Sequence, residues 1–395
     1  MKKKIGLLPK LIIGIIVGII IGLVCSQLDN YVLIKVMNTF AATFGNFLKF
    51  MVPIVILGFV IPGIAHLGDS AGKLLGITAG IAYVSAITAG FIAYALGIAI
   101  LPSFISAGAI AQGGEIDLSP YFEIGMAPVM GVMTALVLAF ILGIGIARNK
   151  AEALNDVIND FQKIVAGVVR VILIPFIPFY IATIFAKLTA TGEIFSTMSS
   201  FAIVFVLILG LQLSYIIIQY LISFLVTKKN PVKSIKNMLP AYFTALGTQS
   251  SAATIPVTIQ CASKNEVSED IVDFVIPLGA TIHLAGDTIT LVLAAMGVMM
   301  IGGEMPTLQQ MIPYIFMLGI TMVAAPGIPG GGVVAALGLM EKMLFFGPEQ
   351  QALMIALHFA QDSFGTATNV TGDGAIAIVV DKIASWTKKE KAKKA

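Results

Sequence analysis

Five polar residues near the end of the chain are well placed to bind a charged ligand. His358, Asp362, Thr366, Asn369 and Asp373 follow one another at intervals of three or four in an otherwise apolar stretch. On a helix this spacing places all five on one face. If the stretch lies in a membrane, each buried carboxylate costs at least about 2.5 kcal/mol, and residues 350–381 contain no Lys or Arg. We expect bound cations or a substrate ammonium group to neutralise this face; the alternative is a structural network with neighbouring helices.

A second polar segment, PLGATIHLAGDTITL, covers residues 277–291. Gly279 and Gly286 flank His283, and Asp287 follows the histidine at the spacing of neighbours on a helix. Glycines permit local unwinding, which frees carbonyl oxygens as ligands for alkali and alkaline-earth cations. The segment therefore indicates cation binding or proton relay by a His283–Asp287 pair, or a buried pair that only fixes packing.

The elements that must position these residues are those of a polytopic membrane protein. Of 395 residues, 58% are hydrophobic and 11% charged, against roughly 25% charged in soluble proteins. Apolar runs long enough to cross a hydrocarbon core about 30 Å thick recur along the chain. In the apolar runs before residue 230, Lys49 and Arg170 are the only basic residues that lie well inside a run. The spans expected before residue 230 are residues 10–28, 32–65, 71–101, 124–148, 157–188 and 196–227.

Basic residues indicate the orientation. They gather before the first span, after the sixth and at residues 388–394, whereas residues 102–123 contain none. The positive-inside rule then predicts that both termini are cytoplasmic, with residues 386–395 as a basic tail. The first apolar run is longer than a signal-peptide core, so we interpret it as a retained helix in a plasma-membrane protein. Cys25 and Cys261 are expected on opposite sides, which argues against a disulfide.

Two later apolar segments are interrupted. Residues 240–262 are broken by glycine, proline and hydroxyl residues, and residues 311–340 by a Gly/Pro run. The arms are too short to cross a bilayer, and non-helical backbone at that depth must be buried in protein or line a wet cavity. Paired interrupted segments point to a transport site, although ordinary hairpins with surface turns are the alternative. The expected order is hairpin 231–265, helix 270–301, hairpin 307–346 and helix 349–384.

These motifs, in this order, resemble the sodium:dicarboxylate symporters, a family that includes glutamate/aspartate transporters and bacterial serine/threonine transporters. The serine-rich tip, the GATI helix, the Gly/Pro hairpin and the helix ending NVTGD carry the resemblance. It implies an all-α polytopic membrane fold with eight transmembrane helices plus two re-entrant hairpins. It further implies a homotrimer in which residues 1–230 form a scaffold, part of it packing on the core, and residues 231–385 form a transport core that moves as an elevator.

The resemblance also implies which residues meet the substrate. In the first tip, QSSAATIP (residues 249–256), Ser250 and Ser251 match the family and Gln249 replaces an arginine. The second tip, GIPG (residues 327–330), would be the gate. In residues 362–373 the family pattern D-x-x-R-T-x-x-N-x-x-G-D is kept except at its arginine. Asp362 would bind the substrate ammonium group and Asn369 the carboxylate. The implied substrate-binding residues are Ser250, Ser251, Gly327, Pro329, Asp362, Gly365, Thr366 and Asn369.

Sodium ions are the co-transported ligands that the resemblance implies, and no cofactor or nucleic-acid partner is expected. The implied ligands act mostly through backbone carbonyls, whereas Asp373 would use its carboxylate. They are Gly279, Thr281, His283, Asp287, Val323, Ala325, Asn369 and Asp373. His283 and Ala285 replace the asparagine and the aspartate of the family's N-M-D-G-T motif. We therefore expect fewer coupled sodium ions than in glutamate transporters, or a proton in place of one, with His283 as the candidate.

Gly365 bears on the substrate. It stands where acidic-substrate members carry arginine, and an acidic side chain there would be a buried, unpaired charge. We expect sodium-coupled uptake of a small neutral amino acid such as serine, threonine or alanine. Uptake of an acidic amino acid or C4-dicarboxylate is the alternative, and a passive channel is a further one. An intramembrane aspartic protease would need Asp287 and Asp373 close enough to share a proton, and both lack the first glycine of its G-x-G-D motif.

Overall fold

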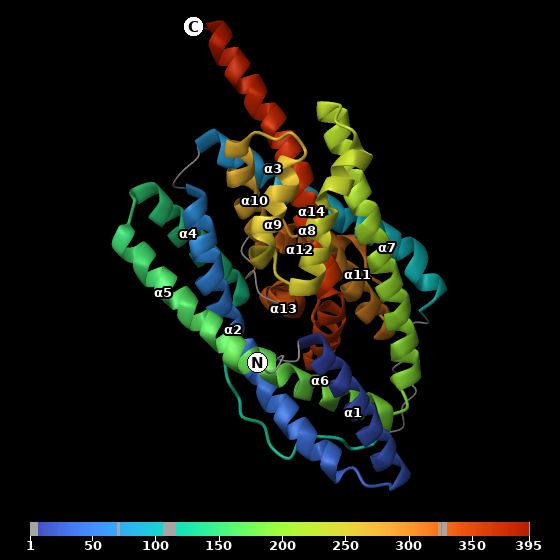
Figure 1. Ribbon diagram of the computed structural model, residues 1–395. Helices are drawn as coiled ribbons and strands as arrows, with labels where there is room; N and C mark the ends of the chain where they lie inside the picture. Colours follow the sequence, from blue (N-terminus) through green and yellow to red (C-terminus); the bar gives the residue numbers. More distant parts are fainter. Residues whose placement is uncertain (1–6, 69–71, 106–115, 323–324, 326–329, 395) are drawn as a thin grey trace, which may run out of the picture.

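The computed structural model describes residues 7–68, 72–105, 116–322, 325 and 330–394. Within them every regular element is a helix (Figure 1), as expected because helices satisfy backbone polar groups in lipid. Six segments are long and apolar enough to cross a membrane. The elements before residue 230 are α1 (Leu7–Gln27), α2 (Val32–Gly68), α3 (Gly72–Ile100), the 3₁₀ turn η1 (Leu101–Ser103), α4 (Val132–Asn149), α5 (Glu152–Val168), the π-helical turn η2 (Val169–Leu173), α6 (Ile174–Ala190) and α7 (Ile194–Thr227).

Two expected spans differ from the structure. The fourth was expected from residue 124, but α4 begins at Val132 after an extended Gly131. Glycine is a poor helix former and Pro128 lacks a backbone N–H, so the preceding residues do not extend the helix. The fifth is divided by η2, which ends immediately before a helix that has proline in its first turn and Pro178 inside it. Because proline cannot donate the usual helical hydrogen bond, a π turn is a common local adjustment.

Helices α1 and α6 pack backbone to backbone through small residues. A Cβ built on Gly14 would lie 2.5 Å from the carbonyl oxygen of Pro178, and one built on Gly18 would lie 2.3 Å from that of Ala182. Such close approach through small residues is the usual way in which membrane helices associate. Helix α2 packs against α4, α5 and α6, whereas α3 and α7 pack against α11 and α14.

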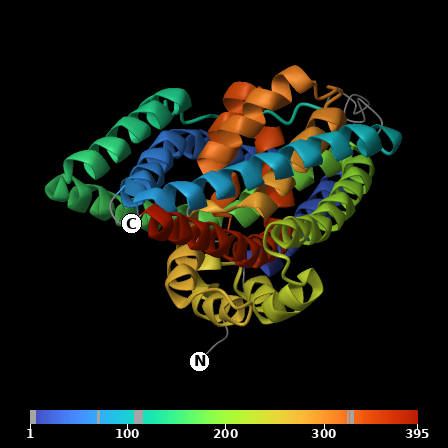
Figure 2. The ribbon, with the colours of Figure 1, turned by 90° about the horizontal axis from the view of Figure 1, so that it is seen from above.

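The remaining elements are built around one long helix. They are α8 (Pro231–Thr248), α9 (Ser251–Ser263), α10 (Glu269–Ile282), α11 (Ala285–Ile301), α12 (Leu308–Met322), α13 (Gly331–Met343) and α14 (Pro348–Lys394). Figure 2 shows α14 (red) between the α8–α9 pair (yellow) and the α12–α13 pair (orange), and α14 contacts α8, α9 and α13. Helix pairs lie where the two hairpins were expected. The last helix, expected over residues 349–384, continues to Lys394 through most of the expected tail, and the expected helix 270–301 is two helices.

The two hairpins approach α14 from opposite ends. At the base of the first hairpin, Ser268 donates a hydrogen bond to Asp381, near the C-terminal end of α14. The second hairpin ends beside Phe346, whose carbonyl accepts from Gln351 in the first turn of α14. The two tips nevertheless reach adjacent residues in the N-terminal half of α14: Gln249 donates to Ser363 Oγ at 2.8 Å, and Gly330 N–H to Asp362 Oδ2 at 3.0 Å. This geometry encloses a site at the centre of the molecule.

Candidate functional site

The polar face predicted on the last helix is buried. All five of its members are at most 6% exposed: His358, Asp362, Thr366, Asn369 and Asp373. Neither basic residue considered as a partner reaches this face, because Lys49 lies 3.5 Å from Glu341 and Arg170 is exposed on η2. Among the described residues, this face forms two ion pairs, each between a histidine and an aspartate: His283 with Asp373, and His358 with Asp287. Its charge therefore has to be balanced by histidines, hydrogen bonds and ligands.

The break between α10 and α11 positions a second set of polar groups. Helix α10 ends at Ile282, and His283 and Leu284 have non-helical backbone with ψ of 89° and 51°. The chain resumes as α11 at Ala285, so Asp287 lies in the first helical turn. A carboxylate is stabilised there by the free N–H groups and dipole of the helix N-terminus. The break thus presents His283 and Asp287 to different neighbours.

Asp287 is the centre of one network. Its Oδ1 lies 2.8 Å from His358 Nε2, and its Oδ2 accepts a hydrogen bond from Asn369 Nδ2 at 2.6 Å. Asn369 Oδ1 in turn accepts from the Gly286 N–H at 2.7 Å. Ligand atoms of Asp287, His358 and Asp362 all lie within 4.8 Å of one another. Two carboxylates and one imidazole therefore share one buried volume.

Asp362 meets the second hairpin tip. Its Oδ2 accepts the N–H of Gly330, the residue that precedes α13. Gly330 has φ of +74°, a conformation that glycine adopts without strain. A Cβ on Gly332 would lie 2.8 Å from Asp287 Oδ1 and 3.2 Å from His358 Nε2. The first turn of α13 therefore lies directly over both carboxylates.

A small cavity of about 20 Å³ lies where these groups meet. Several predicted site residues line it: Ser251, Asp287, Ala325, Asp362, Thr366 and Asn369. The lining also includes Gln249, Ala280, Leu284 and Gly332, which the sequence patterns did not single out as ligands. One water needs roughly 10–15 Å³ measured in this way. The enclosed space therefore holds about one water molecule.

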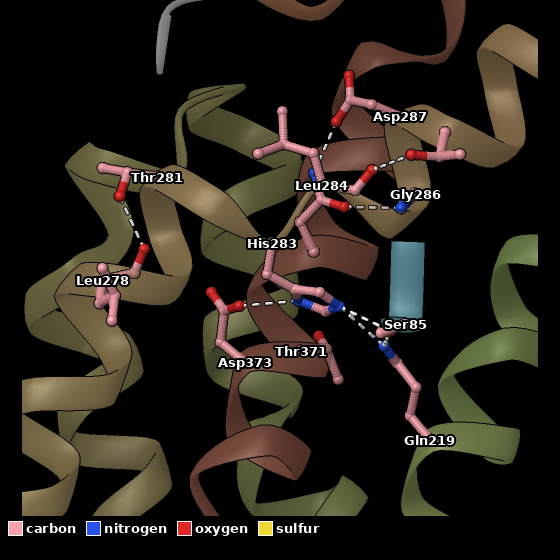
Figure 3. A network of polar contacts seen from close by, with 12 residues as sticks. Ser85, Gln219, Leu278, Thr281, His283, Leu284, Gly286, Asp287, Thr371 and Asp373 are labelled. Carbon is pink, nitrogen blue, oxygen red and sulfur yellow. Dashed lines mark hydrogen bonds and ion pairs between the residues drawn. The ribbon is translucent and has the colours of Figure 1, made fainter. Parts of the chain in front are cut away.

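His283 belongs to a second network, on the other side of the helix break. Its Nδ1 lies 3.0 Å from Asp373 Oδ1, and its Nε2 lies 3.0 Å from Ser85 Oγ and 3.2 Å from Gln219 Nε2 (Figure 3). Asp373 Oδ2 is buried without a hydrogen-bond partner. A Cβ on Gly279 would lie 2.7 Å from Asp373 Oδ1, so the backbone of α10 closely approaches this carboxylate. A buried carboxylate oxygen without a partner is the type of hard oxygen ligand that suits an alkali or alkaline-earth cation.

The expected pair of His283 and Asp287 does not form. Each pairs with a residue of α14 instead, because the non-helical residues between α10 and α11 separate two positions that a continuous helix would keep together. Asp287 and Asp373 are consequently held by different histidines and do not form the carboxylate pair that a protease would need. Ser85 on α3 and Gln219 on α7 were not singled out from the sequence, since each lies in an apolar span among other scattered polar residues such as Thr88 and Gln212.

Other predicted site residues lie elsewhere. Ser250 accepts from Ala253 N–H as the cap of α9 and does not line the cavity. Thr281 is exposed and donates to the Leu278 carbonyl. Gly365 lies beside the cavity, where a Cβ would be 3.7 Å from the backbone nitrogen of Asp287. The predicted ligands Val323, Gly327 and Pro329 fall outside the described residues.

Comparisons with known proteins bear on the family of this chain. Excitatory amino acid transporter 1 of Ambystoma tigrinum is 30% identical over 250 residues, which are 62% of this chain and 46% of that protein. Excitatory amino acid transporter 3 of Oryctolagus cuniculus is 31% identical over 248 residues, 62% of this chain and 47% of its own length. The match therefore spans about half the length of these curated relatives. The sequence profile of the sodium:dicarboxylate symporter family matches residues 7–383, so the chain belongs to that family.

Proposed function

We propose that this protein is a secondary active transporter that couples the flow of sodium to the uptake of a small neutral amino acid such as serine, threonine or alanine. The observation that carries the proposal is the meeting of two hairpin tips over Asp362 and Ser363, in the buried part of α14. A site closed by two separate tips can open to either side in turn, which alternating access requires. Membership in a symporter family supports the same reading.

The chemistry of the cavity suits the two charged ends of an amino acid. Asp362 would bind the α-ammonium group in a charge-assisted hydrogen bond, the stronger kind in a buried site. Ser251 and Asn369, which both line the cavity, would donate to the α-carboxylate. Because Gly330 N–H and a substrate ammonium group would share the Asp362 carboxylate, binding and closure of the second tip involve the same residue. Ala325 lines the cavity beside this tip, where a carbonyl could face a sodium ion.

A neutral substrate is favoured by the charges around the cavity. The described lining contains two carboxylates and no Lys or Arg, and Gly365 supplies no side chain where acidic-substrate members have arginine. An acidic side chain would add a third negative charge to a site that is already short of positive charge. The matched relatives are named as excitatory amino acid transporters, so uptake of an acidic amino acid is the second candidate.

Further features of the proposal rest on the family and the charge distribution. We propose a homotrimer in the plasma membrane with both termini in the cytoplasm, a scaffold within residues 1–230 and a mobile core in residues 231–385. Asp373 is the proposed carboxylate ligand of a coupled sodium ion. The packing of α3 and α7 against α11 and α14 supports assigning these two helices to the moving body.

Uptake by the purified protein in liposomes tests the proposal. With an inward sodium gradient, labelled serine should accumulate above its external concentration, and aspartate should not compete. Asp362→Asn should abolish this accumulation while leaving the folded protein intact. Glu304→Gln, in an exposed loop, is the matched control and should transport normally. Serine flux without accumulation would indicate a channel, and aspartate uptake would establish the second candidate.

A further inference from the structure

The second carboxylate of the cavity, Asp287, is not needed to bind the ammonium and carboxylate groups that all amino acids share. We propose that Asp287 forms a side-chain subsite that selects amino acids whose side chain donates a hydrogen bond, namely those with a β-hydroxyl or β-amino group. This inference rests on the proposed function and narrows its substrate class. It predicts that serine is favoured over alanine, although alanine is the smaller molecule.

The Asp287 carboxylate keeps unused hydrogen-bonding capacity after these shared groups are bound. The substrate contributes one ammonium group, which Asp362 takes up, and one carboxylate, which the neutral donors of Ser251 and Asn369 take up. The Asp287 carboxylate then remains, at 5% exposure. His358 Nε2 and Asn369 Nδ2 each donate to one of its oxygens. An ionised carboxylate offers about four lone-pair sites and accepts only, so further donors can still bind it.

The position of Asp287 places this capacity beside the substrate's side chain. A Cβ on Gly365 would lie 3.7 Å from the Asp287 backbone nitrogen and 3.7 Å from the Gly286 carbonyl carbon. Acidic-substrate members of the family build their arginine from this same position. In this chain the residue is glycine, and Asp287, whose backbone nitrogen that Cβ would approach, provides one of the two carboxylates of the cavity lining. The sign of the charge that would face the distal group of the substrate is therefore reversed.

Closure of the second tip makes the subsite selective. Gly332 lies so close to Asp287 Oδ1 that a Cβ there would approach it to 2.8 Å, so the closed tip excludes water from that side of the carboxylate. A buried acceptor that loses water without gaining a donor costs free energy. A substrate hydroxyl or ammonium group replaces the lost water, whereas the methyl group of alanine cannot. Hydrogen bonds to charged groups are worth enough to discriminate by about ten- to hundredfold.

Binding titrations on the full-length protein in sodium-containing buffer test the inference. The ligands are L-serine, L-alanine, L-2,3-diaminopropionate and L-aspartate. The wild-type protein should bind serine and diaminopropionate about ten- to hundredfold more tightly than alanine, and aspartate least. Asp287→Asn should lose diaminopropionate affinity most, since it removes the charge but keeps an acceptor, and Asp287→Leu should reduce the serine-to-alanine ratio to near one. Asp273→Asn, an exposed change on α10, should leave every ratio unchanged.

The outcomes separate this inference from the proposed function. If the wild-type protein binds alanine as tightly as serine, the Asp287 subsite is refuted, and this measurement needs no variant. The proposed function of amino-acid transport would be unaffected by that result. If no amino acid binds, both are refuted. A manganese titration tests the alternative that this cluster is a metal site, because Asp287, His358 and Asp362 could together hold an ion. Manganese binding that Asp287→Asn abolishes, with the serine-to-alanine ratio unchanged, would overturn the subsite in favour of a metal site.

Discussion

Replacing Gly330 with alanine should weaken substrate binding, because it holds the second hairpin tip away from α14. A Cβ built on Gly330 would lie 2.0 Å from Cζ of Phe359. Phe359 is only 2% exposed, so its ring has little room to withdraw. The same glycine donates the hydrogen bond by which the closed tip meets Asp362. The substitution therefore acts on the contact that covers the substrate cavity.

The size of the effect follows from two costs. An L-residue in the left-handed region at φ of +74° is strained by roughly 1–2 kcal/mol. Adding a methyl group to a packed core typically costs roughly 1–3 kcal/mol. Together these raise the free energy of the closed tip by roughly 2–5 kcal/mol. If substrate binds tightly only beneath a closed tip, its Kd rises as the closed population falls, and the lower bound corresponds to about thirtyfold.

The assay compares serine Kd values and substrate-free unfolding midpoints of matched variants. Gly192→Ala is the control, because Gly192 has φ of +81° and a Cβ there would meet nothing within 4 Å. The Gly192→Ala variant introduces the same backbone strain without a steric clash, at a position outside both hairpins. It should therefore leave the serine Kd unchanged. The double variant Gly330→Ala/Phe359→Leu should recover part of the affinity by shortening the obstructing side chain. A wild-type serine Kd in Gly330→Ala would refute the argument that this tip must close as the structure shows.

Two further changes test the ion and substrate assignments. His283→Asn should make uptake depend more steeply on sodium concentration, because it frees Asp373 Oδ1 from the imidazole. The control is Ser85→Ala, since Ser85 contacts only the other nitrogen, Nε2, of that ring. Identical sodium dependence in wild type and His283→Asn would count against competition between the imidazole and the cation. Gly365→Arg should permit aspartate binding and weaken serine binding, because the arginine would pair with Asp287 or Asp362. A side chain can be accommodated at its Cβ, since the nearest atom would be 3.6 Å away. Gly365→Ala should not admit aspartate, and an arginine variant that folds but binds only serine would contradict the role given to this position.

The polar face of α14 and the two hairpins could be predicted from sequence because their signals are local. The interval of three or four residues from His358 to Asp373 defines a helix face wherever the helix lies. The Gly/Pro runs likewise mark interruptions without reference to the rest of the fold. The all-helical membrane fold and the family were predicted on the same grounds, and the structure and the profile match confirm both.

The partners within the site could not be predicted because they depend on how helices meet. Regular helical spacing paired His283 with Asp287, but two non-helical residues between α10 and α11 direct them to different parts of α14. Gln219 and Ser85 reach the imidazole from α7 and α3, which are distant in sequence and apolar around these residues. The start of α4 and the π turn before α6 were missed for a different reason. There proline and glycine act on the backbone within a run whose hydrophobicity alone suggests a continuous helix.

The helix break also gives a physical route by which ion and substrate sites can influence each other. Its two non-helical residues are adjacent but face different sites: His283 contacts Asp373, and Leu284 lines the substrate cavity. Gly286 follows directly and is held from both sides, by Asn369 at its N–H and by Gln212 at its carbonyl. With Gly286 held in place, a shift of His283 that admits a cation at Asp373 must be absorbed mainly at Leu284. We therefore expect a cation at Asp373 to change the shape of the cavity. Substrate would then make different contacts with and without the cation, which is what thermodynamic coupling between the two sites requires.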